Sequence, residues 1–256
     1  MPIPTFNVLG VAVRAMNLPT ATAAILDAVR ARRKGYVCLA AVHGISEAQR
    51  DPELKRAYNR ALLATTDGMP LVWLAKWHVG GGGIGRVYGP DLMLEVFRAT
   101  QDGGAAHFLC GGAEGVAELL KQKLLEKFPR ARITGTWCPP FREPTGDDEK
   151  QLAAAVSAAR PDIMWVGLGA PKQELFMARH LGALDTTLMI GVGAAFDFHA
   201  GKLRQAPRWM RRCGLEWFFR LCAEPRRLWR RYLVCNPLFI FRTACQLLGL
   251  RKYPVL

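Results

Sequence analysis

Short apolar runs alternate with longer segments of helical periodicity over the first 200 residues, and this alternation limits the fold more than any other feature. Runs such as DIMWVGLG (162–169) and TLMIGVG (187–193) are apolar at consecutive positions rather than at every second one. Continuous apolar strands are typical of a parallel sheet that helices cover on both faces. The sequence therefore predicts an α/β protein with a mostly parallel, Rossmann-like sheet.

The pattern assigns each segment of this region to a strand or a helix. The predicted strands are 7–13, 36–41, 106–110, 131–136, 162–167 and 187–192. The predicted helices are 19–32, 46–62, 90–101, 114–127, 147–159 and 172–182. We expect residues 1–200 to form a nucleotide-sugar-binding catalytic domain and residues 201–256 a basic, helical appendage.

Three of the predicted strands end in glycine: FLCGGAEG (108–115), WVGLGAPKQE (165–174) and MIGVGAAFDFHAG (189–201). Ligands of open α/β sheets bind beyond the carboxyl ends of the strands, where glycines let the backbone approach a phosphate. A single such glycine is an ordinary turn residue, but three in one sheet favour a nucleotide ligand. None of the three segments has the glycine pattern of a dinucleotide dehydrogenase or a P-loop.

Positive charge is concentrated at the C-terminal end. Residues 201–256 contain thirteen lysines and arginines against two glutamates, which points to a polyanion or an anionic membrane surface as partner. In EPRRLWRRYL (224–233) the arginines and the apolar residues are predicted to lie on opposite faces of an amphipathic helix. Packing of this helix on the protein itself is the alternative. The next apolar run, 233–241, is broken by Pro237 and is too short to span a membrane.

Several common functions lack their sequence signals. The seven cysteines are odd in number and never spaced C-x-x-C, so neither a disulfide framework nor a zinc site is indicated. There is no D-x-D pair to hold a metal on a diphosphate, and no export signal at the N-terminus. We expect a cytoplasmic, metal-independent protein without a cofactor. From its local sequence alone, TTDGMP, Asp67 is predicted to be an ordinary turn residue.

Residues 36–200 resemble the WecG/TagA/CpsF glycosyltransferases, also called glycosyltransferase family 26. The matching stretches are TDGMPLVW (66–73), RVYGPDL (86–92), FLCGG (108–112), PDIMWVGLGAPKQE (161–174), GVGAAFDFHAG (191–201) and, in the tail, RQAPRWMRRCGLEWFFRLCAEPRR (204–227). The resemblance implies an inverting enzyme that transfers a sugar from a UDP-sugar donor to a polyprenyl-diphosphate-linked saccharide. From the basic amphipathic helix we expect peripheral attachment to the inner face of the plasma membrane, on the cytoplasmic side.

The resemblance also suggests which residues act. It makes Asp67 the general base, which takes the proton of the acceptor hydroxyl. The expected donor-binding residues are Arg86, Gly111, Gly112, Gly167, Gly169, Lys172 and Gln173. Arg220, Arg227 and Arg230 are expected at the diphosphate or the acceptor, where arginines would replace a metal ion.

One departure from the family pattern concerns the donor. Many members have T-x-N after the second strand, where this chain has Leu39, Ala40 and Ala41. The donor sugar therefore cannot be carried over, and His43 either replaces a polar contact or is structural. Two other classes remain as alternatives, a basic nucleic-acid-binding α/β protein and a nicotinamide-dependent oxidoreductase. We expect no nucleic acid as partner, and the sequence leaves open whether the chain forms a homo-oligomer.

Overall fold

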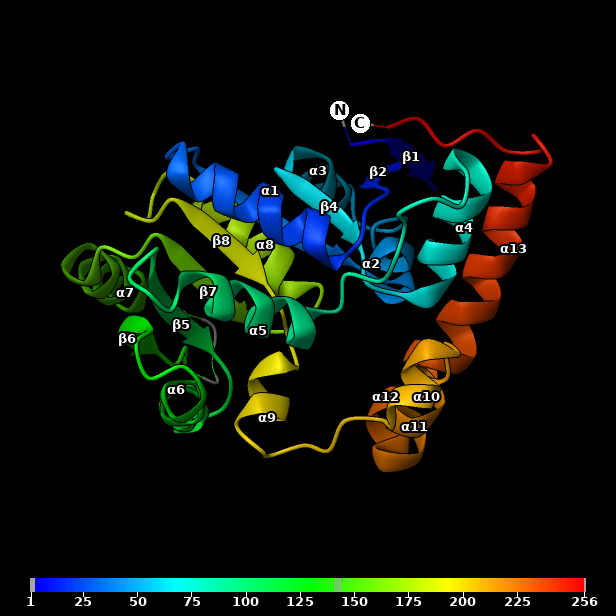
Figure 1. Cartoon of the computed structure of the whole chain (residues 1–256). Coiled ribbons are helices and arrows are strands. Elements are labelled where there is room, and N and C mark those ends of the chain that lie inside the picture. The colour runs from blue at the N-terminus through cyan, green and yellow to red at the C-terminus, as the bar shows by residue number, and fades with distance from the viewer. Residues whose placement is uncertain (1–2, 141, 143, 256) are drawn as a thin grey trace. The chain divides into compact units, whose positions relative to one another are not determined.

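The computed structural model describes residues 3–140, 142 and 144–255 (Figure 1). The described strands are β1 (Thr5–Val8), β2 (Val11–Arg14), β3 (Gly35–Ala40), β4 (Leu63–Thr66), β5 (Ala106–Gly111), β6 (Arg132–Trp137), β7 (Ile163–Gly167) and β8 (Leu188–Gly191). The described helices are α1 (Leu18–Arg30), α2 (Val42–Glu47), α3 (Pro52–Arg60), α4 (Met69–Val79), α5 (Gly89–Thr100), α6 (Val116–Lys127), α7 (Gly146–Ala159), α8 (Lys172–His180), α9 (Ala195–His199), α10 (Arg208–Arg212), α11 (Glu216–Ala223), α12 (Pro225–Trp229), the π-helical turn η1 (Arg230–Val234) and α13 (Cys235–Leu247).

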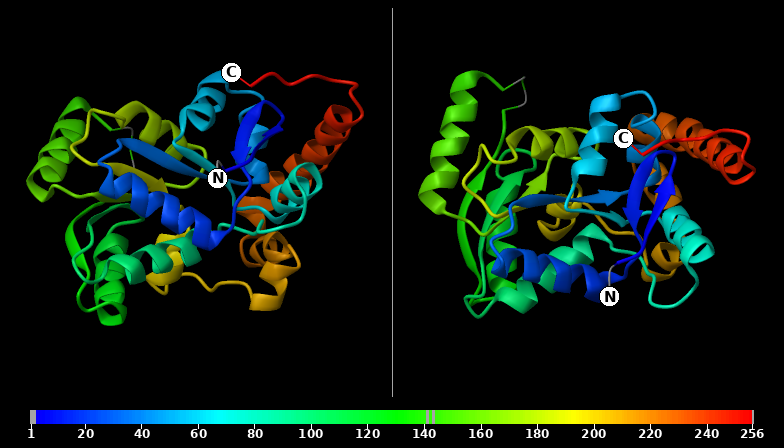
Figure 2. Two further views of the ribbon diagram at one scale, coloured as in Figure 1. Left: turned by 45° about the horizontal axis from the view of Figure 1, so that its top comes forward. Right: turned by 90° about the horizontal axis from the view of Figure 1, so that it is seen from above.

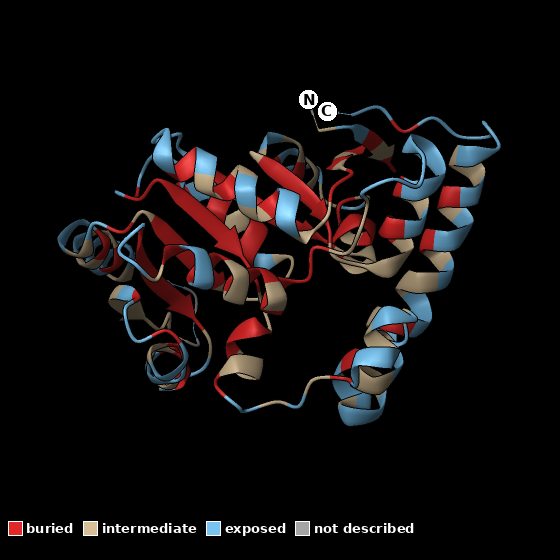
Figure 3. Ribbon diagram, in the orientation of Figure 1, coloured by how far each residue is buried: buried red, intermediate tan, exposed pale blue. Residues whose placement is uncertain are grey.

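The strands confirm the predicted fold class. Their order is β1-β2-β4-β3-β8-β7-β5-β6. β1 runs antiparallel to β2, and every other pairing whose register is described is parallel. All residues of β3 and β5 are buried, β5 visibly so in Figure 3, which explains why their sequences are mostly apolar. The chain is a mixed α/β protein with a mostly parallel, Rossmann-like sheet.

The chain divides into two compact units, each of which combines separated segments. Unit 1 contains Met1–Asn17, Leu39–Tyr88 and Gln205–Leu256, and unit 2 contains Leu18–Cys38 and Gly89–Arg204. The C-terminal residues thus group with segments from the N-terminal third of the chain. The expectation that 1–200 and 201–256 form separate domains stays a prediction.

Unit 2 holds the greater part of the sheet. In Figure 2, α1 and α5 cover one face of its strands and α8 lies on the other. α1 packs against α5, and α8 packs against β7 and β8. The predicted boundaries of α5, α6 and α7 lie within two residues of those observed. Helix periodicity is reliable here because each helix buries one apolar stripe on the sheet.

The predicted strand 7–13 is wrong, because the chain reverses in its middle. Leu9 and Gly10 both have positive φ, 51° and 83°, and form the two-residue turn of the β1–β2 hairpin. Such turns suit the twist of paired strands. A side chain at Gly10 would lie 2.7 Å from the carbonyl oxygen of Pro254, so glycine is needed for space as well as for conformation.

The predicted helix 46–62 is also wrong and comprises two helices. α2 ends at Glu47, and Asp51 then begins α3 by accepting hydrogen bonds from the amides of Glu53 and Leu54. Pro52 at the start of α3 fits because the first turn needs no N–H from it. The short buried strand β4 follows and went unpredicted because its four residues, LATT, are too few to show a period.

The predicted faces of the C-terminal helix are only partly correct. Leu228 and Tyr232 are buried, but Trp229 and Leu233 are 45% and 57% exposed and share the outer side with Arg230. Residues four apart lie on one helical stripe, so the apolar residues fall on two stripes rather than one. Pro237 does not break the chain's next helix, because it lies in the first turn of α13. None of the helices in the described part of the chain is long and apolar enough to cross a membrane.

Candidate functional site

Asp67 lies directly beyond β4, in a loop that the backbone holds at both ends. The amides of Asp67 and Gly68 both donate to the carbonyl oxygen of Ala40 at the end of β3, at 2.9 and 3.3 Å. Gly68 is the N-cap of α4, and the amide of Leu71 donates back to its carbonyl oxygen. The side chain of Asp67 is therefore presented at the carboxyl end of a strand, between a strand and a helix N-terminus. This is where α/β sheets bind their ligands.

Arg86 joins Asp67 to an acidic residue from the tail. Nη2 of Arg86 lies 3.3 Å from Oδ1 of Asp67, and Nη1 lies 2.7 Å from Oε2 of Glu216. Nε of Arg86 donates to the main-chain carbonyl oxygen of Asp67. The three side chains are 24%, 18% and 12% exposed for Asp67, Arg86 and Glu216. Two carboxylates thus share one guanidinium at the margin of solvent.

Tyr88 completes this arrangement. Its hydroxyl donates to Oε1 of Glu216 at 3.2 Å, and the guanidinium of Arg86 stacks 4.1 Å above its ring. Both oxygens of Glu216 are therefore engaged, one by Arg86 and one by Tyr88. Burial, together with the charge of Glu216, raises the pKa of the Tyr88 hydroxyl, so it remains a hydrogen-bond donor at neutral pH.

The environment of Asp67 raises its pKa to about 6. Burial is the main cause, because a low dielectric disfavours the charged carboxylate, and Glu216 adds repulsion. Arg86 and Arg220 oppose the rise. Oδ1 faces Arg86 and is shielded from solvent, which leaves Oδ2 as the oxygen that can reach a ligand. A carboxylate with a pKa close to neutrality is suited to proton transfer.

The tail arginines take different positions within unit 1. Arg220, on α11, is half-buried and acts on the charge of Asp67. Arg227 and Arg230 are exposed; Arg227 pairs with Glu224 at 2.5 Å, and Arg230 lies over the ring of Trp229 at 5.2 Å. Arg220 is thus brought to Asp67. The expected roles of Arg227 and Arg230 stay predictions.

Arg231 lies on the inner side of its helix, although the sequence predicted it on the lipid-facing basic side. It is half-buried, and its guanidinium interacts with the charges of Asp67 and Arg220 and lies 5.8 Å from the ring of Tyr232. Burial and the neighbouring Arg220 lower its pKa. The reason is spacing, because Arg231 lies next to the inward stripe of Leu228 and Tyr232.

Unit 2 brings the predicted glycines together at the ends of β5 and β7. The strands pair up to Gly111 and Gly167, and the amide of Gly112 donates to the carbonyl oxygen of Gly167 at 3.0 Å. A side chain at Gly111 would lie 2.6 Å from the backbone of Gly167. Gly169 is different, since it has φ +73° and open space where a side chain would be. An approaching phosphate could therefore meet bare backbone at Gly169.

The helix that follows, α8, begins with Lys172 and Gln173. Lys172 is exposed, whereas Gln173 is buried and donates to the buried Glu174 at 3.0 Å. The amide group of Gln173 lies against Gly191 and Gly193. Lys172 is therefore exposed to a ligand, while Gln173 packs against the end of β8. Their roles in donor binding stay predictions.

His43 is the second residue of α2, two positions after the Leu39–Ala41 departure from the family pattern. Burial and the nearby Arg231 lower its pKa to about 4, so its ring is neutral at pH 7. Among the described residues, the one group that could hold a metal ion is His43 with Glu47 and Cys235. It was not predicted, because its members lie far apart in the sequence.

Glu216 contacts Arg86 and Tyr88 beside Asp67, and it was not assigned to the candidate site from the sequence. It lies in GLEW, a stretch quoted for the resemblance, and it is one of two acidic residues among thirteen basic ones in the tail. An acid in so basic a segment points to a specific partner, and here the partners are Arg86 and Tyr88. The charge pattern marks Glu216 as unusual, but it does not say which residues Glu216 contacts.

Comparison with known proteins adds to this geometry. A model of the glycosyl transferase WecG/TagA/CpsF family matches residues 6–253. One similar protein is the N-acetylglucosaminyldiphosphoundecaprenol N-acetyl-beta-D-mannosaminyltransferase of Bacillus subtilis, 31% identical over 58% of this chain and 56% of the relative. A protein of the same name from Bacillus spizizenii is 28% identical over 73% of this chain and 70% of the relative. The alignment thus spans little more than half the length of the first relative. Because the family match runs over nearly the whole sequence, the chain belongs to the glycosyl transferase WecG/TagA/CpsF family.

Proposed function

We propose that the chain is an inverting glycosyltransferase that moves a sugar from a UDP-sugar to a polyprenyl-diphosphate-linked saccharide in bacterial cell-surface or exopolysaccharide synthesis. The observation that carries the proposal is Asp67, a carboxylate with a pKa of about 6 beside Arg86, at the end of a sheet strand. Both Bacillus relatives are named for transfer to a diphosphoundecaprenol-linked sugar. The proposal extends that class of acceptor to this chain.

In the proposed reaction Asp67 is the general base. Its Oδ2 accepts the proton of the acceptor hydroxyl while that oxygen attacks the anomeric carbon and the bond to UDP breaks on the opposite side. Attack from that side inverts the anomeric configuration. Arg86 holds the carboxylate in place and is itself held by Glu216, and Arg220 adds positive charge beside Asp67. Asp67 ends the step protonated and returns its proton to water.

The leaving diphosphate needs positive charge, which we propose comes from arginines and backbone amides rather than from a metal ion. In unit 2, the uncovered backbone at Gly169 and the exposed Lys172 can bind a phosphate. In unit 1, the exposed Arg227 and Arg230 and the half-buried Arg220 supply positive charge. Hydrogen bonds to a charged leaving group strengthen as the bond breaks, so these contacts would lower the barrier.

The test of the proposal is product analysis. The full-length protein is incubated with a lipid-diphosphate saccharide and a panel of UDP-sugars, with and without added Mg²⁺ or Mn²⁺, and the products are identified by mass spectrometry. We expect one UDP-sugar to give a lipid-linked product extended by one residue, at a rate that Mg²⁺ does not raise. Failure of every UDP-sugar would contradict the proposal, and a strict Mg²⁺ requirement would contradict metal independence.

A change at Glu216 should move the pH dependence of this reaction. Glu216 raises the pKa of Asp67, so Glu216→Gln should lower it and shift the acid limb of kcat/KM below the wild-type value of about 6. The measurement is kcat/KM between pH 4.5 and 8 for both proteins. Glu95→Gln, at an exposed ion pair on α5, is the matched control and should leave the limb in place. If the acid limb of kcat/KM is the same in Glu216→Gln as in wild type, Glu216 does not influence the pKa of Asp67.

We propose that unit 1 attaches the enzyme to the inner face of the plasma membrane. Helices α4 and α13 expose Trp77 at 66%, Ile240 at 67% and Phe241 at 66%, and the same unit carries the basic tail. Exposed apolar side chains beside arginines are typical of a surface that lies in an anionic lipid interface. The prediction that the protein is cytoplasmic and peripheral is part of this proposal.

The membrane proposal predicts a loss of lipid binding in Ile240→Ser/Phe241→Ser. We expect about a 10–100-fold weaker partition onto phosphatidylglycerol liposomes in a sedimentation assay, because two large apolar side chains no longer enter the lipid. Leu181→Ser, which alters an exposed leucine of unit 2, is the control and should bind like wild type. Equal binding by all three proteins would show that attachment does not use α13.

A further inference from the structure

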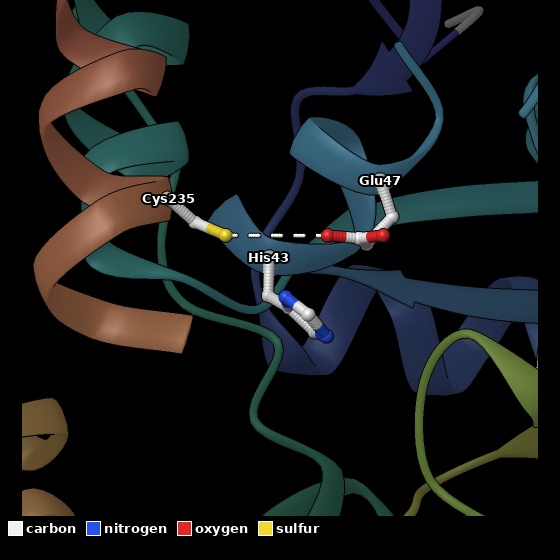
Figure 4. Close-up of side chains that lie close together, drawn as sticks. All are labelled: His43, Glu47 and Cys235. Atoms are coloured by element: carbon white, nitrogen blue, oxygen red, sulfur yellow. Dashed lines mark hydrogen bonds between the residues drawn. The ribbon is translucent and has the colours of Figure 1, made fainter. Parts of the chain in front are cut away.

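Three side chains of unit 1 converge at a place that the proposed reaction does not use. His43 and Glu47 come from α2, and Cys235 is the first residue of α13. One ligand atom of each lies within 4.8 Å of the other two, and Sγ of Cys235 is 4.0 Å from Oε1 of Glu47. Figure 4 shows Cys235 directed at Glu47 with the His43 ring beside them. An imidazole, a carboxylate and a thiol thus meet at one point.

The sequence explains why these residues meet. His43 and Glu47 are four residues apart, which puts them on the same side of α2 one turn from each other. Helix α13 packs against α2, so that its first residue is brought to that side. The pairing of two ligands at i and i+4 with a third from a neighbouring helix is a common way to build a metal site.

His43 supplies a second observation that points to a ligand. Its Nδ1 is buried and has no hydrogen-bond partner among the described residues. Buried polar atoms in native proteins are almost always paired, so an unpaired ring nitrogen beside a thiol and a carboxylate calls for an explanation. A metal ion bound at that nitrogen would satisfy it.

The donor types select the metal. We propose that His43, Glu47 and Cys235 bind Zn²⁺ and thereby join α2 to α13. Mg²⁺ and Ca²⁺ prefer oxygen ligands alone, whereas Zn²⁺ takes nitrogen, sulfur and oxygen together. A thiolate and a carboxylate also neutralise the two charges of Zn²⁺, which matters because Arg50, Arg231 and Arg242 all act on Cys235.

The geometry is close to what Zn²⁺ requires. Tetrahedral ligands at usual zinc distances lie about 3.3–3.8 Å from one another. The ligand atoms of the three side chains now lie within 4.8 Å of one another, and small rotations of these side chains would bring them into that range. These residues supply three ligands, and water completes the fourth position. Zinc here would join α13 to α2. The N-cap of α2 is Ala41, and the residue before it, Ala40, accepts the hydrogen bonds that hold the Asp67 loop.

The test uses Co²⁺, because its absorption reports both the ligand and the geometry. The full-length protein is reduced, freed of metal with a chelator and titrated with Co²⁺. We expect saturation at one equivalent, a thiolate-to-cobalt band in the near ultraviolet, and the visible bands of a tetrahedral site. Zn²⁺ should then displace the Co²⁺ and raise Tm.

Variants decide whether these three residues are the ligands. Cys235→Ser should lose the thiolate band, and His43→Gln and Glu47→Gln should each weaken Co²⁺ binding at least tenfold. Cys245→Ser, which alters a second cysteine of α13, is the matched control and should keep the full spectrum. The exposed Cys213 and Cys222 are replaced by serine in every protein tested, so that neither contributes.

Two results would overturn the proposal. One is no stoichiometric Co²⁺ binding by a protein whose circular dichroism shows it folded. The other is a thiolate band that persists in Cys235→Ser, which would place the metal elsewhere. Neither depends on sugar transfer, so the zinc site and the proposed function fail or stand separately.

Discussion

Asp67→Asn will lower turnover by about 10²–10⁴-fold and leave UDP binding close to that of wild type. The change removes the group that takes the acceptor proton, and an amide of the same shape cannot replace it. The measurements are steady-state kcat on a soluble acceptor and the Kd of UDP by calorimetry. Turnover close to that of wild type in Asp67→Asn would contradict the assignment of Asp67 as the general base.

Stability separates loss of the base from loss of the fold. The pKa of Asp67 is about 6 in the folded protein against 3.8 for an ordinary aspartate, so above pH 6 the ionised carboxylate costs stability. Asp67→Asn removes that cost, and its Tm at pH 8 should equal or exceed that of wild type. Asp27→Asn, at an exposed ion pair, is the control and should change neither turnover nor Tm.

The sequence allowed the α/β core to be predicted because its signals are local. Strands such as β5 and β7 are buried on both faces, so their own residues reveal them. β4 and the β1–β2 hairpin were missed or merged for the opposite reason. β4 has only four residues, too few to show a period. The turn at Leu9–Gly10 contains a single glycine, which is a weak sequence signal for a hairpin.

The candidate site could be predicted only in part. Asp67 and Arg86 came from motifs shared with a family, and the structure brings them within 3.3 Å of each other. Glu216 and Arg231 were not assigned to the site because their positions depend on how α11 and η1 fold back within unit 1. His43 and Cys235 lie almost 200 residues apart in the sequence, so no spacing rule could pair them.

The tail illustrates the same limit. Its charge indicates a segment with an anionic partner, but not which part of the chain its last residues contact, and these are hydrogen-bonded to the β1–β2 hairpin. The side chain of Gln246 accepts a hydrogen bond from the backbone amide of Leu9 and donates one to the carbonyl oxygen of Asn7. The side chain of Asn7 donates to the carbonyl oxygen of Tyr253. Composition shows where charge lies in the sequence, whereas such contacts depend on the three-dimensional path of the chain.

Arg86→Met should be the most destabilising single change at the site. Arg86 is the cation between Asp67 and Glu216, and without it two carboxylates face each other with little solvent. Removing one member of such a group costs about 2–4 kcal/mol, because the charges left behind have no partner. Denaturant unfolding at pH 8 measures the loss. Arg30→Met, at an exposed ion pair, should change stability by less than about 0.5 kcal/mol.

The pH dependence of that loss is what identifies its cause. Arg86 lowers the pKa of Asp67, so Arg86→Met should raise it, opposite in sign to Glu216→Gln, and should move the acid limb of kcat/KM upward. At pH 5 Asp67 is protonated in the variant, the repulsion is gone and the stability loss should be smaller than at pH 8. Arg86→Met/Glu216→Gln removes one of the two facing charges and should recover part of the stability at pH 8. An equal loss at both pH values, with no recovery in the double variant, would mean that Arg86 acts through packing on Tyr88 instead of through charge.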